Sequence, residues 1–471
     1  MLKDFHMKFK LTLLHVVFLG FAISASGQTL EAVWGFTNGF SAPRNPIGAV
    51  VLGPDGNFYG TTQYGGTKDY GAIFQVTTNG ILNIVASLDS SKTGSSPMSA
   101  LTLGPDGNFY GTTTFLGPKL AGTVFRMTIN GTVTVIASFS PAVWSGTTLT
   151  NQDGDTPQAG VTFGPDGCLY GTTIQGGTNG GGTIFKLTTN GVLTTLFALG
   201  GTNGRGSRAN LTVGPGGMLY GTTYLGGTNS GSDGTVFKVT TNGAFTKLVD
   251  FTGANGSNPQ GALVVGPDQN LYGTTVNGGD GTVFKLTTNG TLTTIVSFNF
   301  ETGASPMAGL TLGPDGNLYG TLSGGSYSTN SGGAVFRVTT NGALTILADF
   351  ASTNGYEPQA PLTLGPDGSF YGTTPNGGPA GTGAGVVYRF SLPLLPTNRF
   401  VGITIDADGI ATLNVASTPG STNRLWVTTN SSLLMAQWQV IATNIATNGV
   451  FQFLDSDTGG KPIKFYRVST P

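Results

Sequence analysis

Short apolar runs alternate with turn residues over most of the chain, and residues 308–359 show the pattern in full. The apolar runs AGLTLG, NLYGT, AVFRVT and ALTILADF are separated by PDG, by the glycine-rich SGGSYSTNSGG and by TNG. Asp-Gly and Asn-Gly between β-forming residues favour tight hairpins, because these residues tolerate positive φ. The pattern therefore predicts four antiparallel strands, followed by the link ASTNGYEPQ to the next unit.

This unit occurs seven times. The phrase GPDGNFYGTT stands at Gly53–Thr62 and again at Gly104–Thr113, and five altered copies begin at Gly164, Gly214, Gly266, Gly313 and Gly365. The tyrosines of the seven copies are 47 to 60 residues apart: Tyr59, Tyr110, Tyr170, Tyr220, Tyr272, Tyr319 and Tyr371. A period of about 50 residues is typical of a repeat architecture.

The two ends of the repeat region distinguish a β-propeller from a β-solenoid. The last repeat has a third strand, GVVYRFSL, but no fourth, whereas TLEAVWGFTNG (Thr29–Gly39) has the pattern of a fourth strand whose unit never began. A ring closes when the N-terminal strand completes the last unit, and a solenoid has no need for this exchange. The sequence therefore predicts an all-β fold with a seven-bladed β-propeller.

Four segments are expected along the chain. Lysines, an apolar run from Leu11 to Ile23 and a small-residue stretch indicate an export signal over 1–27. The propeller is expected over 28–392 and a linker over 393–396. Residues 397–471 contain further strand patterns without the GPDG phrase, which favours a small C-terminal β-sandwich. We therefore expect a secreted protein, extracellular or associated with the cell surface, with no membrane span after signal cleavage.

Composition narrows the chemistry. The net charge of −1 in 471 residues gives no basic surface for a nucleic-acid partner. Both histidines, His6 and His15, lie in the expected signal, and Cys168 is the only cysteine, which excludes an intrachain disulfide and most thiolate metal sites. Other copies have Asn, Met or Ser at the place of Cys168, so we interpret it as a tolerated substitution at a strand edge.

The phrases LGPDGNLYGTL, GTVFKLTTNG and LTTIVSF resemble the GloVer tandem repeat of secreted bacterial proteins that carry a choice of C-terminal anchors. The resemblance covers about Val33 to Phe390 and implies export and a propeller-like fold, but no activity. The C-terminal part is similar to small modules that end in a FYRV-type strand. The apolar helix and terminal basic cluster of a usual anchor are missing from this sequence.

The predicted topology separates two faces of the propeller. The PDG and TNG turns lie on one face, and the glycine-rich loops and the links lie on the other, here named the variable face because its sequences differ between repeats. Binding residues are usually carried by varied loops on a rigid scaffold. The candidate ligand-binding residues are the aromatic residues of this face, which can stack on sugars or hold a peptide: Tyr64, Tyr70, Phe115, Trp144, Tyr224, Tyr327 and Tyr356, with Phe40 beside them.

The variable face also carries the charged candidates. The enlarged link SPAVWSGTTLTNQDGDTPQ holds Asn151, Asp153 and Asp155, which alternate as in a calcium loop, although Thr156 stands where such a loop needs glycine. We expect no cofactor, with calcium at these three residues as the alternative. Catalysis without histidine would depend on carboxylates such as Glu301, Glu357 and Asp280.

Charges that recur in every repeat are interpreted as structural. The turn aspartates favour local backbone hydrogen bonds, and the basic residues of the third strand are expected to lay their stems on the blade with their heads in solvent. These bases are Arg126, Lys186, Lys238, Lys285, Arg337 and Arg389, with Gln75 in the first repeat.

Three functional hypotheses follow from this pattern. The leading one is a secreted, non-enzymatic propeller, expected to be a monomer, that binds a polysaccharide or a cell-surface protein through its variable face. The second is a carboxylate-dependent polysaccharide lyase or glycoside hydrolase. The third is a structural component of a surface layer, which would self-associate without a ligand.

Overall fold

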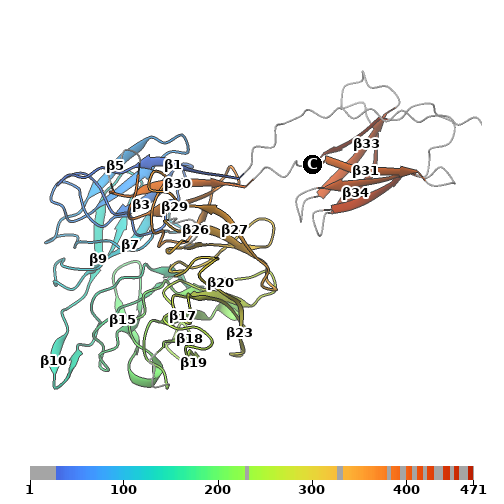
Figure 1. Ribbon diagram of the computed structural model, residues 1–471. Coiled ribbons are helices and arrows are strands. Elements are labelled where there is room, and N and C mark those ends of the chain that lie inside the picture. Colours follow the sequence, from blue (N-terminus) through green and yellow to red (C-terminus); the bar gives the residue numbers. More distant parts are fainter. Residues whose placement is uncertain are drawn as a thin grey trace, which may run out of the picture. The chain divides into compact units, whose positions relative to one another are not determined.

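The computed structural model describes residues 28–228, 233–325, 332–378 and 383–392 in full, and the backbone of six strands between Arg399 and Ser469. These residues divide into two compact units, one over 28–391 and one from residue 392 onward. The first is an all-β, seven-bladed propeller, as predicted, and its blades are marked by the strand labels of Figure 1.

Each blade is an antiparallel sheet of four strands. Blade 1 contains β2 (Val51–Leu52), β3 (Phe58–Thr62), β4 (Ala72–Val76) and β5 (Leu82–Ser87). Blade 2 contains β6 (Thr102–Leu103), β7 (Phe109–Thr113), β8 (Thr123–Met127) and β9 (Val133–Ser138). Blade 3 contains β12 (Thr162–Phe163), β13 (Leu169–Thr172), β14 (Thr183–Leu187) and β15 (Leu193–Ala198). Blade 4 contains β16 (Thr212–Val213), β17 (Leu219–Thr223), β18 (Thr235–Val239) and β19 (Phe245–Asp250).

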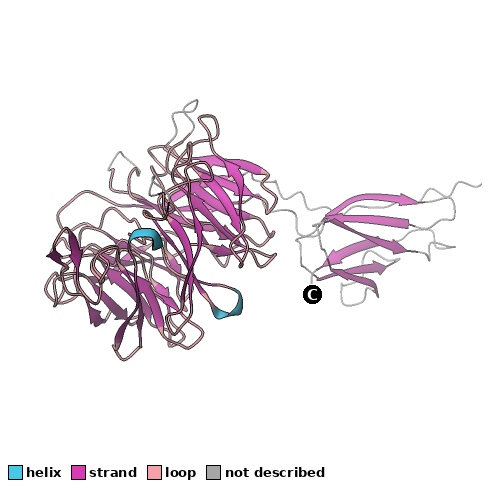
Figure 2. Cartoon of the chain, turned by 90° about the horizontal axis from the view of Figure 1, so that it is seen from below, coloured by secondary structure: helices cyan, strands magenta, loops and turns pink. Residues whose placement is uncertain are grey.

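Blade 5 contains β20 (Val264–Val265), β21 (Leu271–Thr275), β22 (Thr282–Leu286) and β23 (Leu292–Ser297). Blade 6 contains β24 (Thr311–Leu312), β25 (Leu318–Leu322), β26 (Ala334–Val338) and β27 (Leu344–Asp349). Blade 7 contains β28 (Thr363–Leu364), β29 (Phe370–Thr374), β30 (Val386–Ser391) and β1 (Thr29–Gly35). A small extra hairpin, β10 (Val143–Ser145) with β11 (Thr148–Thr150), lies in the link after blade 2. Two short 3-10 turns, Gly201–Asn203 and Pro215–Gly217, are the helical segments within the described residues (Figure 2).

The N-terminal strand completes the last blade. β1 pairs antiparallel with β30, from Thr29 opposite Ser391 to Gly35 opposite Val386. A side-chain hydrogen bond from Thr363 Oγ1 to Val50 O, 2.5 Å long, joins blade 7 to blade 1. The first and last strands of the propeller therefore lie in one sheet, so that the ring is closed by hydrogen bonds between its ends.

The Tyr-Gly-Thr part of each repeat builds the core. Gly171 lies opposite Phe185 on the next strand, and a Cβ at Gly171 would stand 2.4 Å from the Phe185 ring, so glycine lets that ring lie against the backbone. The neighbouring tyrosine packs on the next blade: the ring centroids of Tyr59 and Phe109 are 4.4 Å apart. The repeated phrase therefore packs each blade internally and against its neighbour.

The tyrosine hydroxyl, the turn aspartate and the base of the third strand form one network in several blades. In blade 3, Tyr170 donates a hydrogen bond of 2.7 Å to Asp166, and Lys186 Nζ lies 2.7 Å from the same carboxylate. Blade 5 repeats this arrangement with Lys285 and Asp268. The basic heads of these two blades therefore pair with the turn carboxylate at the surface, a contact that the sequence analysis did not include.

The C-terminal unit contains two three-stranded antiparallel sheets. One has β32 (Ala411–Ala416) between β31 (Arg399–Ile405) and β35 (Val450–Asp455), and the other has β33 (Thr422–Thr428) between β34 (Gln439–Ile445) and β36 (Phe465–Ser469). This unit is all-β, as expected. Its assignment as a β-sandwich stays a prediction.

Candidate functional site

The link before each innermost strand has a conserved geometry that places one side chain at the central channel. Near the end of each link, a turn begins with a residue in the left-handed conformation, for example Asn258 (φ 57°). A proline follows this residue in six of the seven blades. The proline packs on a glycine of the preceding blade: a Cβ at Gly234 would stand 2.9 Å from Pro259 Cδ. This turn fixes the direction of the residue that follows the proline, Gln260 in blade 5.

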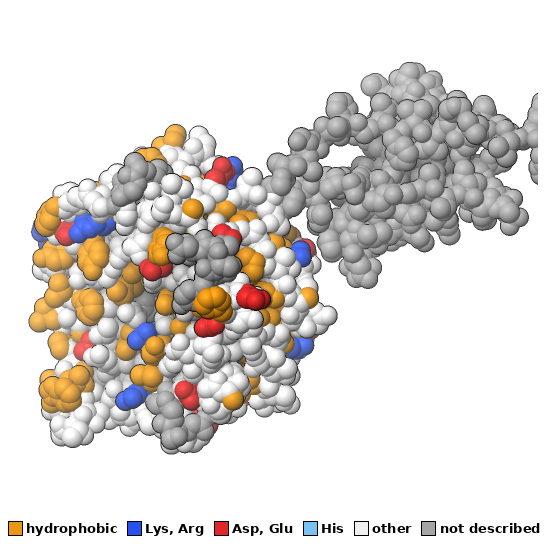
Figure 3. All heavy atoms as spheres, in the orientation of Figure 1, with side chains coloured by type: hydrophobic (Ala, Val, Ile, Leu, Met, Phe, Trp, Pro, Cys, Tyr) orange, Lys and Arg blue, Asp and Glu red, His pale blue; other side chains and the backbone are white. Residues whose placement is uncertain are grey.

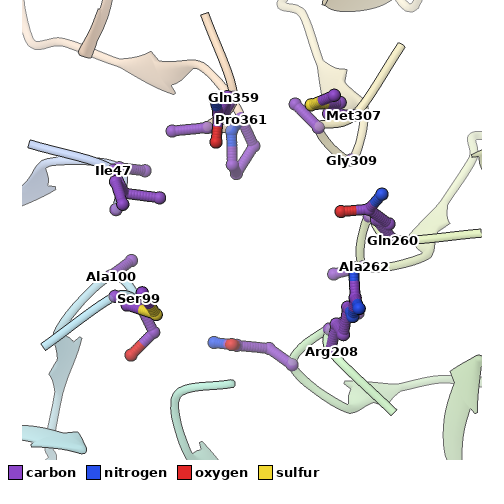
Figure 4. Close-up of a pocket in the computed structure, with 18 of the residues that line it drawn as sticks. Ile47, Ser99, Ala100, Arg208, Gln260, Ala262, Met307, Gly309, Gln359 and Pro361 are labelled. Carbon is purple, nitrogen blue, oxygen red and sulfur yellow. The ribbon is translucent and has the colours of Figure 1, made fainter. Parts of the chain in front are cut away.

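These turns surround a pocket of about 340 Å³ in the channel. Because the links run into the innermost strands, the pocket lies toward the variable face. Figure 4 shows Ile47, Gln260, Met307 and Gln359 around its open centre. The residues that follow the turn in the seven blades all line the pocket: Ile47, Met98, Gln158, Arg208, Gln260, Met307 and Gln359. Sequence reasoning missed this ring, although the variation of one residue within an otherwise repeated link was the signal that could have found it.

Arg208 makes blade 4 different from the others. Its guanidinium lies over the Tyr224 ring, 3.9 Å from the centroid, and its Nε atom is buried without a hydrogen-bond partner among the described residues. Ser207 replaces the proline that precedes this position in the other blades. The residues that line the pocket include Arg208 but neither Asp nor Glu. Among the described residues of the pocket wall, Arg208 is therefore the charged one.

Several predicted aromatic residues are exposed at the loops and links. The exposed fractions are 70% for Phe40 and Trp144, 46% for Phe115, 40% for Tyr356 and 39% for Tyr64. Tyr356 packs over Gly332, where a Cβ would come within 2.1 Å of the ring. These rings can therefore offer a face to a ligand while their backbones are held by the scaffold.

The remaining aromatic candidates differ from this group. Tyr70 is half-buried and packs against a core cluster between blades 1 and 2. Tyr224 is also half-buried and lies under Arg208. Tyr327 lies outside the described residues. The structure thus separates exposed candidates from supporting ones.

The enlarged link between blades 2 and 3 extends from the propeller as the β10–β11 hairpin (Figure 1). Val143 and Trp144 on β10 are both largely exposed, and Trp144 lies opposite Leu149 on β11. Two exposed apolar side chains in succession on a short hairpin form the most prominent apolar feature of this link.

The calcium candidates bind the backbone of the link. Asn151 Oδ1 accepts hydrogen bonds from the amides of Gly154 and Gly177, and Asp155 Oδ2 accepts one of 2.9 Å from Ala142. Asp153 accepts one of 3.3 Å from Ser140. No group of three His, Cys, Asp or Glu residues suited to a metal ion occurs in the described part of the chain. Calcium at this link stays a prediction.

The catalytic candidates occupy different parts of the links and loops. Glu301 is exposed, and its backbone amide donates to Asn299 Oδ1. Glu357 is half-buried, has the left-handed backbone of the link turn (φ 56°) and accepts a hydrogen bond of 2.9 Å from Asn376. Asp280 is half-buried in the loop between β21 and β22, and its carbonyl accepts from Ser305. None of these three side chains lines the channel pocket.

The charge distribution agrees with the low charged content of the sequence. On the side shown in Figure 3, acidic and basic side chains are scattered among many uncharged ones. No helix long and apolar enough to cross a bilayer is found in the residues for which a structure is described. Cys168, just before β13, is half-buried against a core cluster, and burial raises the pKa of its thiol.

Comparison with solved structures finds propellers of low sequence identity. A proposed 6-phosphogluconolactonase from Bacteroides uniformis is 17% identical, with a TM-score of 0.46, and the match covers 69% of this chain and 89% of the other. A proposed glucose dehydrogenase from Thermus thermophilus is 19% identical, with a TM-score of 0.40, and the match covers 78% of this chain and 100% of the other. A gluconolactonase from Xanthomonas campestris is 13% identical, with a TM-score of 0.39, and the match covers 74% of this chain and 97% of the other. We draw no functional argument from these similarities.

Comparison with sequences identifies the family. No curated protein matches the chain. The Gloeobacter/Verrucomicrobia repeat matches residues 20–152, 145–280 and 277–454, so that nearly the whole chain is covered by three tandem matches. The recurring phrase GPDGNFYGTT and its altered copies indicated this kind of repeat, and that expectation is confirmed. A choice of C-terminal anchor stays a prediction. The chain belongs to the Gloeobacter/Verrucomicrobia repeat family.

Proposed function

We propose that this protein is a secreted, non-enzymatic propeller that binds a polysaccharide through its variable face. The observation that carries the proposal is the set of exposed rings on the loops and links, with Trp144 and Phe40 each 70% exposed. Sugar rings present apolar C–H faces that stack on aromatic side chains, while their hydroxyls need polar partners. Gln158, Gln260 and Gln359 of the channel provide amide donors and acceptors for such hydroxyls.

A cell-surface protein is the alternative partner for the same face. Aromatic residues dominate the binding energy of protein interfaces as well. Polysaccharide is favoured because the exposed rings are separated by polar glycine-rich loops rather than joined in one apolar core. In this proposal the chain is exported after removal of 1–27, and the C-terminal unit is a β-sandwich that serves as an accessory or sorting module.

The experiment is a pull-down of the purified protein with insoluble polysaccharides and peptidoglycan, in which retained protein and released soluble sugars are measured together. The proposal expects retention without released products, and loss of retention in Trp144→Ala and Tyr356→Ala. The matched control is Ile81→Ala, which removes a side chain of similar exposure (56%) from a turn on the opposite face.

The other possible outcomes would favour a different function or a different binding surface. Release of products that is abolished by Glu301→Gln or Glu357→Gln would replace the binding proposal by the carboxylate-dependent enzyme. Equal retention of the aromatic variants and the wild type would remove the variable face as the binding surface. Self-association in the absence of any polysaccharide would favour a structural role in a surface layer.

A further inference from the structure

The geometry points to a carboxylate-binding site in the central channel, with Arg208 as its cation, so that the ligand is an acidic polysaccharide that carries uronate groups. This inference rests on the proposed function, because it names the substrate class of the same face. It is carried by three observations: a pocket, an uncompensated cation in its wall, and amide side chains around it.

The charge of the pocket wall comes from Arg208. Among the described residues that line the pocket, Arg208 is charged and none is Asp or Glu. A concave site with low-dielectric walls focuses the field of a single charge. An anionic group that enters the pocket would therefore meet a cation without displacing an existing salt bridge.

Arg44 forms an ion pair of a kind that Arg208 does not form with any described residue. Arg44 also lies over an aromatic ring, with its guanidinium carbon 5.2 Å from the Tyr64 centroid, but it pairs with Asp69 at 2.8 Å. The Nε of Arg208 is buried and has no acceptor among the described residues, although burying an unpaired polar group is costly. Because this Nε is buried, the Nη groups of the same guanidinium are the donors that a ligand oxygen would meet.

The guanidinium of Arg208 has a shape that suits a carboxylate. An arginine presents a planar fork of N–H groups that matches the two oxygens of a carboxylate. The Tyr224 ring, 3.9 Å from the guanidinium, supports one face of this plane and limits its rotation. A pre-oriented fork loses little conformational entropy when a carboxylate binds.

The rest of the pocket wall offers amide groups and apolar side chains. Gln158, Gln260 and Gln359 come from equivalent positions in blades 3, 5 and 7, and their amides can pair with hydroxyl groups. Met98 and Met307 supply apolar contact area between them. Figure 4 shows Gln260 and Arg208 on adjacent parts of the wall. A uronate residue combines the carboxylate, the hydroxyls and the apolar ring face that this wall can accommodate.

The test is isothermal titration calorimetry of the full chain with trigalacturonate and with its neutral methyl ester. We expect the acid to bind more tightly than the ester, and Arg208→Gln to weaken the acid by a factor of about 10 to 100 while leaving the ester unchanged. Arg208→Lys keeps the charge but not the fork, so its affinity for the acid is expected between those of the wild type and Arg208→Gln.

The matched control is Arg205→Gln, which removes an exposed arginine of the same link that does not line the pocket. It should bind trigalacturonate like the wild type. Thermal melting of each variant checks that the propeller is intact. If Arg208→Gln does not fold, Arg208→Lys and Gln158→Leu test the same wall, and each is expected to bind trigalacturonate more weakly than the wild type.

The inference is overturned if the wild type binds the acid no better than the ester, or if Arg208→Gln binds the acid as tightly as the wild type. Competition by equimolar inorganic phosphate as strong as that by unlabelled trigalacturonate would also contradict a carboxylate site. Retention on neutral polysaccharides that is lost in Trp144→Ala would in each case leave the proposed function standing, whereas absence of all retention would end both.

Discussion

The two faces of the propeller use repetition in opposite ways. The turn face is the one that carries the PDG and TNG turns. There, Asp166 accepts a hydrogen bond from Tyr170 and forms an ion pair with Lys186, and the same set recurs with Asp268, Tyr272 and Lys285. On the variable face, the seven residues that line the channel at equivalent positions differ between blades, and Arg208 has no carboxylate partner among the described residues. Repeated groups here are paired with each other and serve the fold, whereas varied groups are left available to a ligand.

Blade 4 shows how far the turn network can be reduced. Gly216 stands in place of the turn aspartate and adopts a φ of 72°. Lys238 donates to Thr288 O at 3.3 Å instead, and only burial raises the pKa of Tyr220. The four strands of this blade still form. The network therefore adds stability to a blade whose packing already specifies the fold.

The largest loss of stability is expected from a substitution in the core that the repeated phrase builds. Gly171→Ala would place a Cβ 2.4 Å from the Phe185 ring and should destabilise the protein by about 3 kcal/mol through overpacking. Gly39→Ala is the control, because its Cβ would meet only Ala42, at 3.4 Å. Thermal unfolding measures both, and equal melting temperatures would refute the packing role of the Tyr-Gly step.

A smaller loss is expected from the turn network. Asp166→Asn removes the charge that pairs with Lys186 and should cost about 1.5 kcal/mol at neutral pH, reduced by partial exposure of the pair. Chemical denaturation of the variant and the wild type measures this difference. No change in stability would show that blade 3 depends on the network as little as blade 4 does.

The pH dependence of that loss follows from the pKa of Asp166. Burial opposes ionisation, but hydrogen bonds from Lys186 and Tyr170 outweigh it and lower the pKa of Asp166 to about 2. Because the unfolded chain takes up its proton at a higher pH, near 3.8, the stabilisation is present above that value and is lost as the pH falls toward 2. The difference between wild type and Asp166→Asn should therefore shrink across this window, and a constant difference would contradict the ion pair.

A gain is expected at the turn of blade 5. Gln269 has a φ of 62° at the place where the other blades have glycine, such as Gly167 with 75°. A side chain in this conformation is strained, so Gln269→Gly should stabilise the protein by about 1 kcal/mol. Gln269→Ala is the control, since it removes the same side chain without relieving the backbone. Equal stability of the two variants would show that φ is not the cause.

The smallest effect on stability is expected on the variable face. Trp144 is largely exposed on the β10–β11 hairpin, so Trp144→Ala should change the free energy of unfolding by less than about 0.5 kcal/mol. The same variant is expected to lose retention on polysaccharide. A large loss of stability would instead make Trp144 part of the scaffold.

Periodicity was enough to predict the fold, because each repeat states its strands and turns separately and β1 supplies the missing strand of blade 7. The predicted topology also assigned Trp144 and Phe40 to the variable face, and both side chains are exposed. The channel ring could not be predicted in the same way, because the inward direction of Gln260 depends on the left-handed turn at Asn258 and on proline packing across blades. The ion pair of Lys186 with Asp166 could not be predicted either, since Asp166 lies in the turn before β13 and Lys186 lies on β14.

The most direct test of the central claim is the affinity of the wild type, Trp144→Ala and Ile81→Ala for one retained polysaccharide, measured under identical conditions. The account predicts that Trp144→Ala on the variable face weakens binding about ten-fold or more, while Ile81→Ala on the turn face binds like the wild type. Equal losses in both variants, or a loss only in Ile81→Ala, would contradict the division of the propeller into a structural face and a binding face.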